Sequence, residues 1–383
     1  MSRFAKILAA GILLAVGGGP VAAVRQTPQE PPKAPAPTPP PPVEKGPASD
    51  ELKRLRDEDQ ADRQRDWSKV SPAELEAIAE RDRKRLARVR ELLEQDKVVT
   101  PEDFDHAALI FQHGVTPDDY LVAHELALVA LLTSRSRGFN NLPVLAEDRF
   151  LLSVGRKQRF GAQGEAKPTP DGSQIQTTDE EGDLAVTDTL RADLFMAPLA
   201  VAKKEGPMGT MKVFDSLAAH LKQRMDPTWQ EAQKDRPAAK RLAEAAAQAG
   251  DPATSRAEAG KLAAEVLKLY QADELKTPAD YRNAARALLA TAGQQEDGER
   301  TARQLLLAHE LAMVAALRGA QEARPILATS WDAFLKRIGQ PQRYGTLFGN
   351  GGDATPLPPV ARSASDTVRK VFGVPPLKRG AVD

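Results

Sequence analysis

An internal repeat constrains the fold of this chain more than any other feature of its sequence. Four short motifs occur twice in the same order, separated by 177 to 185 residues, and the offset changes only between motifs. A period this long excludes a simple solenoid, so each copy is expected to be a domain-sized unit. The sequence therefore predicts two units, over residues 50–205 and 206–383. The paired motifs begin at Thr100 and Thr277, at Ala123 and Ala308, at Gln158 and Gln342, and at Asp188 and Asp366.

Both copies carry clear signals for helix starts. Thr100, Thr116 and Thr277 are each followed by a proline, and an aspartate stands three residues after each threonine. Ser71 begins the same pattern, with Glu74 as the acid. The hydroxyl accepts a hydrogen bond from an unpaired amide, proline loses nothing at the first helical position, and the acid faces the positive end of the helix dipole. We therefore predict that helices begin at these residues.

Apolar periodicity predicts two further helices in the first copy. One covers residues 120–132 and the other residues 142–154, and the turn between them is typical of an αα-hairpin. Gly155 and its counterpart Gly339 stand where a left-handed residue ends such a helix. Aromatic residues make up only 5% of the chain, so the core should consist of leucine, alanine and valine, which suits helices. We therefore expect an all-α fold with two tandem helical αα-hairpin repeat domains.

The N-terminus has the pattern of an export signal. Arg3 and Lys6 precede an apolar run over residues 7–16, which glycines and Pro20 end, and small residues follow up to Ala23. The run is shorter than the ~20 residues that a membrane-spanning helix needs. We predict a signal peptide over residues 1–23 and an exported protein, periplasmic or extracellular; the alternative is an uncleaved anchor.

Residues 24–49 form a proline-rich segment. Between Thr27 and Pro47 lie ten of the chain's 30 prolines. Such a segment lacks amide donors and favours an extended polyproline II conformation. We interpret it as a disordered spacer, and a ligand for a proline-binding module is the alternative.

Charge and cysteine content exclude several classes of function. The 53 basic residues balance 53 acidic ones, which argues against a protein-wide electrostatic attraction to nucleic acid or to anionic lipid. The chain has no cysteine, and this excludes disulfides, thiolate nucleophiles and cysteine-based metal sites. A basic cluster over residues 81–90 is flanked by acids, so we expect a solvated helix face rather than a site for an anionic partner.

The repeated blocks resemble a known family. Residues 108–114 (ALIFQHG), the AHELA block, the pair Asp148-Arg149 and the Q-R-[FY]-G block are similar to an uncharacterised family of exported bacterial helical proteins. In that family the hairpin of a domain of unknown function ends in a pattern like D-R-x-L…G-x-P-Q-x-[FY]-G-T-Q. The resemblance implies an exported helical fold in two diverged copies and brings no activity with it.

The two copies depart from that pattern at different positions. The first copy has Ala162 where the pattern has threonine. The second copy has Leu347 where the pattern has its last glutamine, Ala333 where the first copy has Arg149, and no counterpart of His113. A chemical site, if one exists, is therefore expected in the first copy.

The histidines do not form a recognised metal motif. A zinc-peptidase helix needs histidines four residues apart, and the fourth residue after His124 is Leu128. We expect His124 to form a hydrogen bond at the hairpin interface. His106 and His113 lie two helical turns apart and are weak metal candidates, with a packing and capping role as the alternative.

The Q-R-[FY]-G block has two interpretations. It can line a ligand groove, in which the glutamine and arginine donate hydrogen bonds and Asp148 orients Arg149. It can instead be a tight return loop, in which the aromatic ring fills the hairpin, the glutamine binds backbone groups and the glycine takes a positive φ. The residues predicted tentatively for binding are Asp148, Arg149, Gln158, Arg159, Phe160, Gln342, Arg343 and Tyr344.

We interpret the chain as an exported binding or scaffold module. Its expected partner is an unidentified protein or peptide, and we expect no nucleic-acid partner, no stable membrane span and no cofactor. No nucleophile elbow or phosphate loop is visible in the sequence. The alternative is a hydrolase or metal-assisted enzyme with its site in the first copy, which requires His106, His113, His124 and Asp148 to converge.

Overall fold

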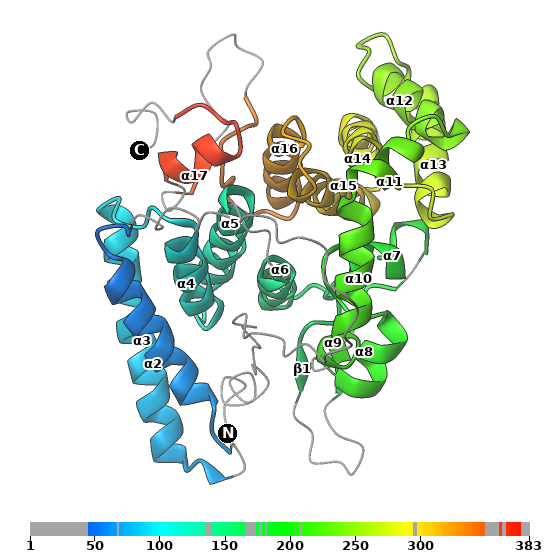
Figure 1. Ribbon diagram of the computed structural model, residues 1–383. Helices are drawn as coiled ribbons and strands as arrows, with labels where there is room; N and C mark the ends of the chain where they lie inside the picture. Colours follow the sequence, from blue (N-terminus) through cyan, green and yellow to red (C-terminus); the bar gives the residue numbers. More distant parts are fainter. Residues whose placement is uncertain are drawn as a thin grey trace, which may run out of the picture.

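The computed structural model describes residues 45–66, 69–134, 140–165, 174–175, 178–180, 182–206, 209–293, 297–348, 360–361 and 365–376. These residues form sixteen α-helices, which confirms the all-α class (Figure 1). The exceptions are a short 3₁₀ helix, Gly182–Leu184, and a two-residue antiparallel ladder between β1 (Gly164–Glu165) and β2 (Gln174–Ile175). The predicted signal peptide, and the predicted spacer up to residue 44, lie outside the described residues. No described helix has the length and apolar character that crossing a membrane requires.

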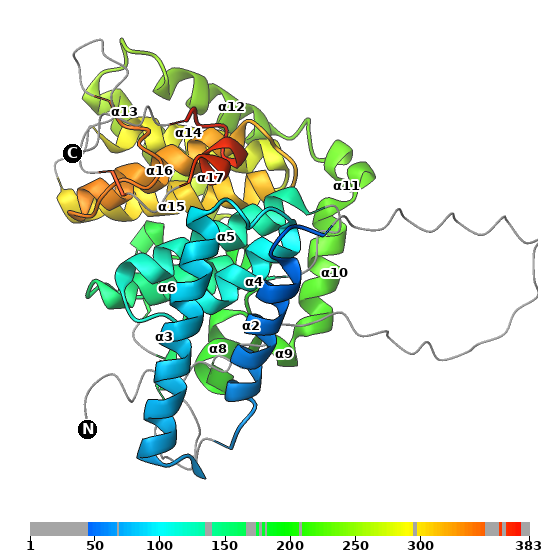
Figure 2. The same cartoon turned by 90° about the vertical axis from the view of Figure 1, so that its left-hand side faces the viewer.

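The first two helices of the described part of the chain form a long charged hairpin beside the rest of the molecule (Figures 1 and 2). Each of the six basic side chains from Arg81 to Arg90 lies within ion-pair distance of an acid, as a solvated face predicts. Arg85 departs from that prediction because it is buried between the helices, where it donates to Asp62 and Asp82 at 2.9 and 2.6 Å. The helices are α2 (Ser49–Arg63) and α3 (Pro72–Glu94).

Two groups of three consecutive helices form the centre of the molecule. In each group the first helix packs on the second and the second on the third. Figure 2 shows the later group above the earlier one. The earlier helices are α4 (Pro101–Gln112), α5 (Pro117–Thr133) and α6 (Leu142–Ser153), and the later ones are α14 (Pro278–Ala292), α15 (Gly298–Leu317) and α16 (Ala323–Arg337).

The predicted helix boundaries are confirmed by their caps. Ser71, Thr100, Thr116 and Thr277 each form a capping box, in which the hydroxyl accepts the amide three residues on and the acid accepts the cap's own amide. Gly155 and Gly339 have φ values of 78° and 76°, as predicted for residues that end α6 and α16. Local hydrogen bonding thus fixes these helix ends.

The remaining helices surround the two groups. The short helix that follows each Q-R-[FY]-G block packs away from its own group: α17 (Asp366–Val371) contacts α5, and α7 (Asp188–Asp193) reaches α14 and α15 through the Asp193 side chain. The others are α8 (Leu199–Glu205), α9 (Gly209–Lys212), α10 (Phe214–Met225), α11 (Pro227–Ala232), α12 (Pro237–Ala249) and α13 (Arg256–Gln271).

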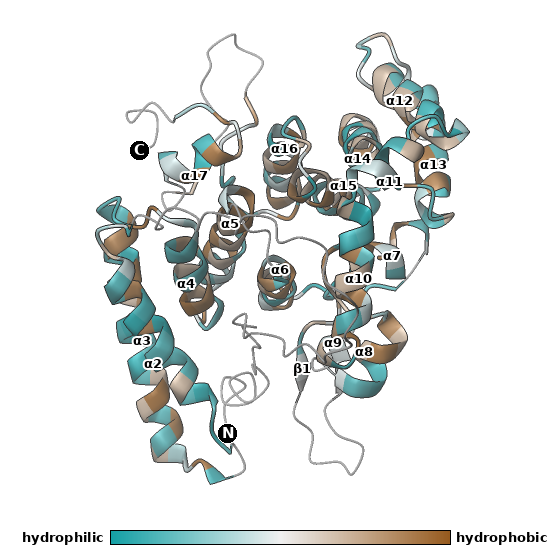
Figure 3. Ribbon diagram, viewed as in Figure 1, coloured by the Kyte–Doolittle hydropathy of each residue, from teal (hydrophilic) through white to brown (hydrophobic). Residues whose placement is uncertain are grey.

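One apolar core runs through both predicted units. The same cluster of buried side chains includes Leu126 from α5, Phe150 from α6, Leu311 from α15 and Trp331 from α16. Figure 3 shows the contrast with α2 and α3, whose ribbons carry many hydrophilic residues. The boundary predicted at residues 205 and 206 therefore divides the sequence without dividing the core.

Candidate functional site

The two A-H-E-L-A blocks meet at the centre of the molecule. His124 lies in the middle of α5 and His309 in the middle of α15, and neither is exposed to solvent. Their Nε2 atoms are 3.0 Å apart. The Nδ1 atom of His124 is 2.8 Å from the Pro143 carbonyl oxygen, and that of His309 is 2.9 Å from the Leu327 carbonyl oxygen. The predicted hydrogen bond of His124 at the hairpin interface is confirmed, and the contact with His309 was not predicted.

A carboxylate and an indole flank the two imidazoles. The Glu147 carboxylate belongs to α6, and one of its oxygens forms a group with the two histidines whose ligand atoms all lie within 4.8 Å of one another. Its counterpart in the repeat is Trp331, whose ring stacks on His309 at 4.5 Å and lies 5.0 Å from His124. Burial, together with the neighbouring Glu310 and Asp148, raises the pKa of Glu147 well above its usual value. In the described part of the chain no N–H group donates to either oxygen of Glu147, and its carboxyl group lies beside that of Glu310.

The glutamates of the two A-H-E-L-A blocks form crossed ion pairs. Arg159 donates from Nε and Nη2 to the two carboxylate oxygens of Glu310, at 2.7 and 2.9 Å. Arg343 donates in the same way to Glu125, at 2.5 and 2.9 Å. All four side chains are buried. Each arginine therefore joins the return loop of one helix group to the second helix of the other group.

Two aspartates organise the return loops. Asp148 accepts hydrogen bonds from the backbone amides of Arg159, Phe160 and Ala162, and Asp332 accepts those of Arg343, Tyr344 and Thr346. The prediction that Asp148 orients Arg149 is wrong, because its oxygens are used by the loop backbone. Arg149 donates instead to the Gln112 carbonyl at 2.7 Å and to Gln163 at 3.0 Å.

The other loop residues have the contacts that the return-loop interpretation requires. The Gln158 side chain binds the backbone of Gln163 through both its oxygen and its nitrogen, and Gln342 does the same with Leu347. Gly161 and Gly345 both have a φ of 61°. The eight residues predicted tentatively for binding are all buried, so the structure offers no exposed groove at Asp148, Arg149, Gln158, Arg159, Phe160, Gln342, Arg343 and Tyr344.

The weak metal candidates lie elsewhere. His113 contacts both carboxylate oxygens of Asp59 at 3.0 Å, beneath the charged hairpin. The group spaced for metal binding in the described ranges contains neither His113 nor His106. His113 contacts Asp59, His124 contacts the Pro143 carbonyl, and Asp148 accepts loop amides. No contact described for these three residues connects one of them to another. The convergence that the hydrolase alternative requires is therefore not formed.

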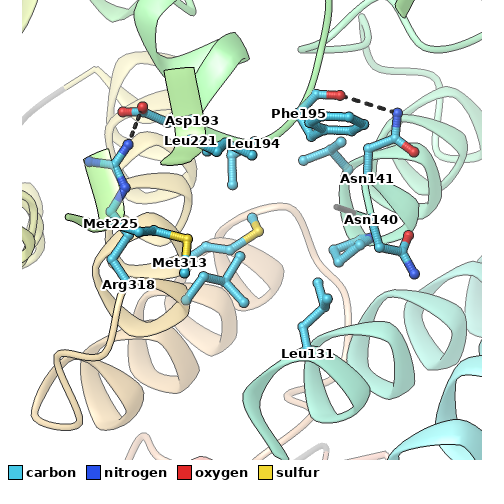
Figure 4. Close-up of a pocket in the computed structure, with 13 residues that line it drawn as sticks. Leu131, Asn140, Asn141, Asp193, Leu194, Phe195, Leu221, Met225, Met313 and Arg318 are labelled. Carbon is cyan, nitrogen blue, oxygen red and sulfur yellow. Dashed lines mark hydrogen bonds and ion pairs between the residues drawn. The ribbon is translucent and has the colours of Figure 1, made fainter. Parts of the chain in front are cut away.

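A cleft lies one helical turn from the histidine pair, between both helix groups and α10 (Figure 4). Pro143 and Met313 both line the cleft. The Pro143 carbonyl accepts the hydrogen bond from His124, and Met313 lies four residues after His309. The space inside amounts to about 60 Å³. Four polar residues contribute to its wall: Asn140, Asn141, Asp193 and Arg318. Its apolar side chains are those of Leu131, Pro143, Val144, Leu194, Phe195, Leu221, Met225, Met313 and Leu317.

One wall of the cleft is strained. Phe195, two residues after the end of α7, has a φ of 59°, in the left-handed region that disfavours residues other than glycine. The corresponding residue after α17 is Gly373, with a φ of 70°. The first copy therefore has a bulky aromatic residue at a position where the second copy has glycine, which adopts a positive φ without strain. Strain of this kind concentrates at functional sites, and Phe195 lines the cleft.

Asp193 is the charged centre of this wall. It accepts hydrogen bonds from Tyr281, Arg318 and His220, the last at 2.6 Å. Burial by itself would raise the pKa of Asp193, but Arg318, His220 and Arg224 outweigh it and hold that pKa below its usual value. The carboxylate thus links α7 to α10, α14 and α15 in its ionised form.

A pH titration of stability tests this assignment. Because the pKa of Asp193 is lower in the folded chain, its stabilising effect is complete above the ordinary value of 3.8 and is lost as the pH falls through the folded value. We expect the free energy of unfolding of the wild type to decrease more steeply below that pH than that of Asp193→Asn. Urea denaturation at a series of pH values measures this. If the free energy of unfolding changes with pH equally in the wild type and in Asp193→Asn, the assignment is wrong.

Comparisons with protein-family models, curated proteins and solved structures find no match to this chain. The resemblance to an exported helical family therefore stays a prediction from the sequence. The repeated A-H-E-L-A block was the signal that could have identified the central histidine pair. Nothing in the sequence singled out Glu147, which the fold brings to the pair from another helix.

Proposed function

We propose that the chain is an exported, duplicated helical module that binds a peptide segment of a partner protein in the cleft beside α10. The observation that carries this proposal is the cleft itself, an apolar cavity that is walled by both helix groups and holds a few polar residues at its edge. Ligand sites commonly have this composition and lie where structural units meet.

The size of the cleft favours a side chain over a free small molecule. Its 60 Å³ is room for roughly four water molecules, whereas pockets for drug-sized ligands hold about 300–1,000 Å³. One aliphatic or aromatic side chain of a peptide fits this space better than an enclosed metabolite. Met225 and Met313 add flexible walls that adapt to different side chains.

Arg318 is one of the polar residues that line the cleft. The Nε atom of Arg318 is buried and has no hydrogen-bond partner within the described residues. A backbone carbonyl of a bound peptide is the kind of acceptor that would satisfy it. The proposed ligand is therefore an extended segment that inserts one apolar side chain and presents a carbonyl to Arg318.

Export and duplication are part of the same proposal. Export is supported by the composition of residues 1–23, and the proline-rich segment that follows would hold the helical part away from a membrane or wall. Duplication is supported by the recurring contacts of Asp148 and Asp332 and of Arg159 and Arg343. Duplication explains why two segments of similar sequence make the same contacts at corresponding positions.

Blocking the cleft tests the proposal. Leu131 is half-buried at its rim, so Leu131→Trp fills the space without opening the core. We expect a random peptide library selected on the wild-type chain to yield peptides with a shared apolar residue. Their affinity for Leu131→Trp should be at least about tenfold lower, because such an anchor contributes ~1.4 kcal/mol or more.

The matched control is Val115→Trp, which adds the same indole at a residue that is 53% exposed and lies outside the cleft. It should bind the selected peptides like the wild type. Failure to select any peptide, or equal loss of affinity in both variants, would show that the cleft is not a peptide site.

A further inference from the structure

We infer that His124, His309 and Glu147 form a binding site for one divalent transition-metal ion of the zinc class. The three side chains come from α15 and from the two helices α5 and α6, so a bound ion would connect the two helix groups at their centre. This inference concerns the buried centre of the molecule and does not depend on the peptide cleft.

The first argument is a count of protons on the two imidazoles. Each Nδ1 atom faces a backbone carbonyl, at 2.8 Å for His124 and 2.9 Å for His309, so each Nδ1 must carry a hydrogen. A neutral imidazole has only one hydrogen on its nitrogens, and both Nε2 atoms then present lone pairs to each other across 3.0 Å. Two lone pairs at that distance repel. A positive species between them removes the repulsion.

The second argument is the position of Glu147. Its carboxyl group is fully buried beside the buried carboxylate of Glu310, lies within 4.8 Å of the ring nitrogens, and accepts no hydrogen bond from an N–H group in the described ranges. An unpartnered carboxylate in the core costs several kcal/mol unless it is protonated or meets a cation. The same cation that separates the two Nε2 atoms would displace the proton that the Glu147 carboxyl group otherwise carries and bind the carboxylate in its place.

Other groups around the centre do not compete for this role. Arg159 is occupied by Glu310, and Arg343 by Glu125, each through two hydrogen bonds. Asp148 is occupied by three backbone amides. Lysine is absent from the contacts described for the centre. Glu147 is therefore the acid at this centre that is left for an added cation.

The ligand set and its support suit zinc. Two imidazole nitrogens and one carboxylate form one of the common zinc sets, and a carbonyl that accepts from Nδ1 fixes the tautomer which offers Nε2 to a metal. Tetrahedral ligands at about 2.0–2.1 Å from zinc are ~3.3 Å apart, so the nitrogens need to move by only a few tenths of an ångström. Glu147 must move further, which its three side-chain torsions permit.

The surroundings indicate a structural ion. Trp331 stacks on His309 and lies beside His124, and these three residues and Glu147 have no exposed surface. Structural sites are closed to solvent, whereas catalytic sites keep an open position for water or substrate. We expect the ion to hold α5, α6 and α15 together.

The test begins with the full chain purified without chelator. Elemental analysis should give about one zinc per chain, or one after incubation with zinc chloride and gel filtration. Removal of the ion with EDTA should lower the midpoint of thermal unfolding by several degrees, and zinc should restore it. X-ray absorption of the zinc-loaded chain should show two imidazoles and one carboxylate, a readout that needs no variant.

Variants locate the site. Glu147→Gln keeps the shape of the side chain and loses its charge, so the affinity for zinc should decrease by at least about tenfold. His113→Gln is the control, because His113 is also a buried histidine but lies against Asp59. It should bind zinc like the wild type.

The inference is overturned if the chain remains free of metal after incubation and zinc and EDTA leave its unfolding midpoint unchanged. In that case the two histidines share a proton, and ¹⁵N NMR would show a third nitrogen-bound hydrogen on the pair. It is also overturned if zinc binding survives Glu147→Gln unchanged or is lost in the folded His113→Gln variant.

Discussion

Replacing Arg159 with methionine is expected to lower the free energy of unfolding by about 3–5 kcal/mol. The reason is the burial of its partner: Glu310 has no exposed surface and receives two hydrogen bonds from the guanidinium, at 2.7 and 2.9 Å. Methionine fills much of the space and donates nothing, so the buried Glu310 carboxylate loses both hydrogen bonds from the guanidinium. Urea denaturation of the wild type and the variant measures the difference.

A second substitution distinguishes a lost charge partner from lost packing. In Arg159→Met with Glu310→Leu both charges are gone, and a buried pair replaced by apolar groups often costs little. The double variant should therefore be more stable than Arg159→Met alone. If the two variants unfold at the same urea concentration, the loss arises from packing, and the ion-pair argument fails.

The matched control is the same kind of pair on the surface. Arg88 donates to both oxygens of Glu51, at 2.7 and 3.1 Å, but these side chains are 38% and 32% exposed. Water solvates both partners, so Arg88→Met should reduce the stability much less than Arg159→Met. A similar loss in both variants would mean that burial does not determine the strength of the pair.

Replacing Asp148 with alanine should destabilise the chain by at least about 3 kcal/mol, because three buried amides each lose an acceptor at a cost of ~1–3 kcal/mol. These amides belong to Arg159, Phe160 and Ala162, and their hydrogen bonds to Asp148 are 2.6 to 3.0 Å long. The loop would then no longer hold Arg159 against Glu310, which adds to the loss. Thermal and urea denaturation both measure it.

Two comparisons make this prediction specific. Asp332→Ala should have a similar effect, since Asp332 accepts three amides in the second return loop. Asp226→Ala removes an exposed helix cap, a single hydrogen bond of 2.9 Å to the Trp229 amide, and should cost only about 1 kcal/mol. If Asp148→Ala is no worse than Asp226→Ala, the aspartate does not organise the loop.

The helix boundaries could be predicted from the sequence because their causes are local. The hydroxyl of Thr116 and the amide of Asp119 are three residues apart, and a hydrogen bond between them needs no contact from elsewhere in the chain. The same holds for Gly155, whose positive φ follows from its position after α6. Signals within one helical turn survive in any tertiary arrangement.

The roles of the polar residues could not be predicted in the same way. The sequence allows Arg159 to be a donor to a ligand or part of a return loop, and in the structure it donates to Glu310, 151 residues away. The sequence suggests that Asp148 orients Arg149, its neighbour in the chain, whereas in the structure it accepts hydrogen bonds from loop amides 11 to 14 residues away. The chemistry of each side chain was apparent, but its partner depended on how the helices pack.

The all-α class, the capped ends of the central helices and the paired motifs are predictable without a structure, because each follows from spacing within a few residues or from direct repetition. Only the tertiary structure placed His124 against His309 and Glu147 beside both, and only it buried the predicted binding residues. The physical reason is that burial in a shared core and contacts between segments more than 100 residues apart depend on the packing of both helix groups at once. No local pattern encodes that packing.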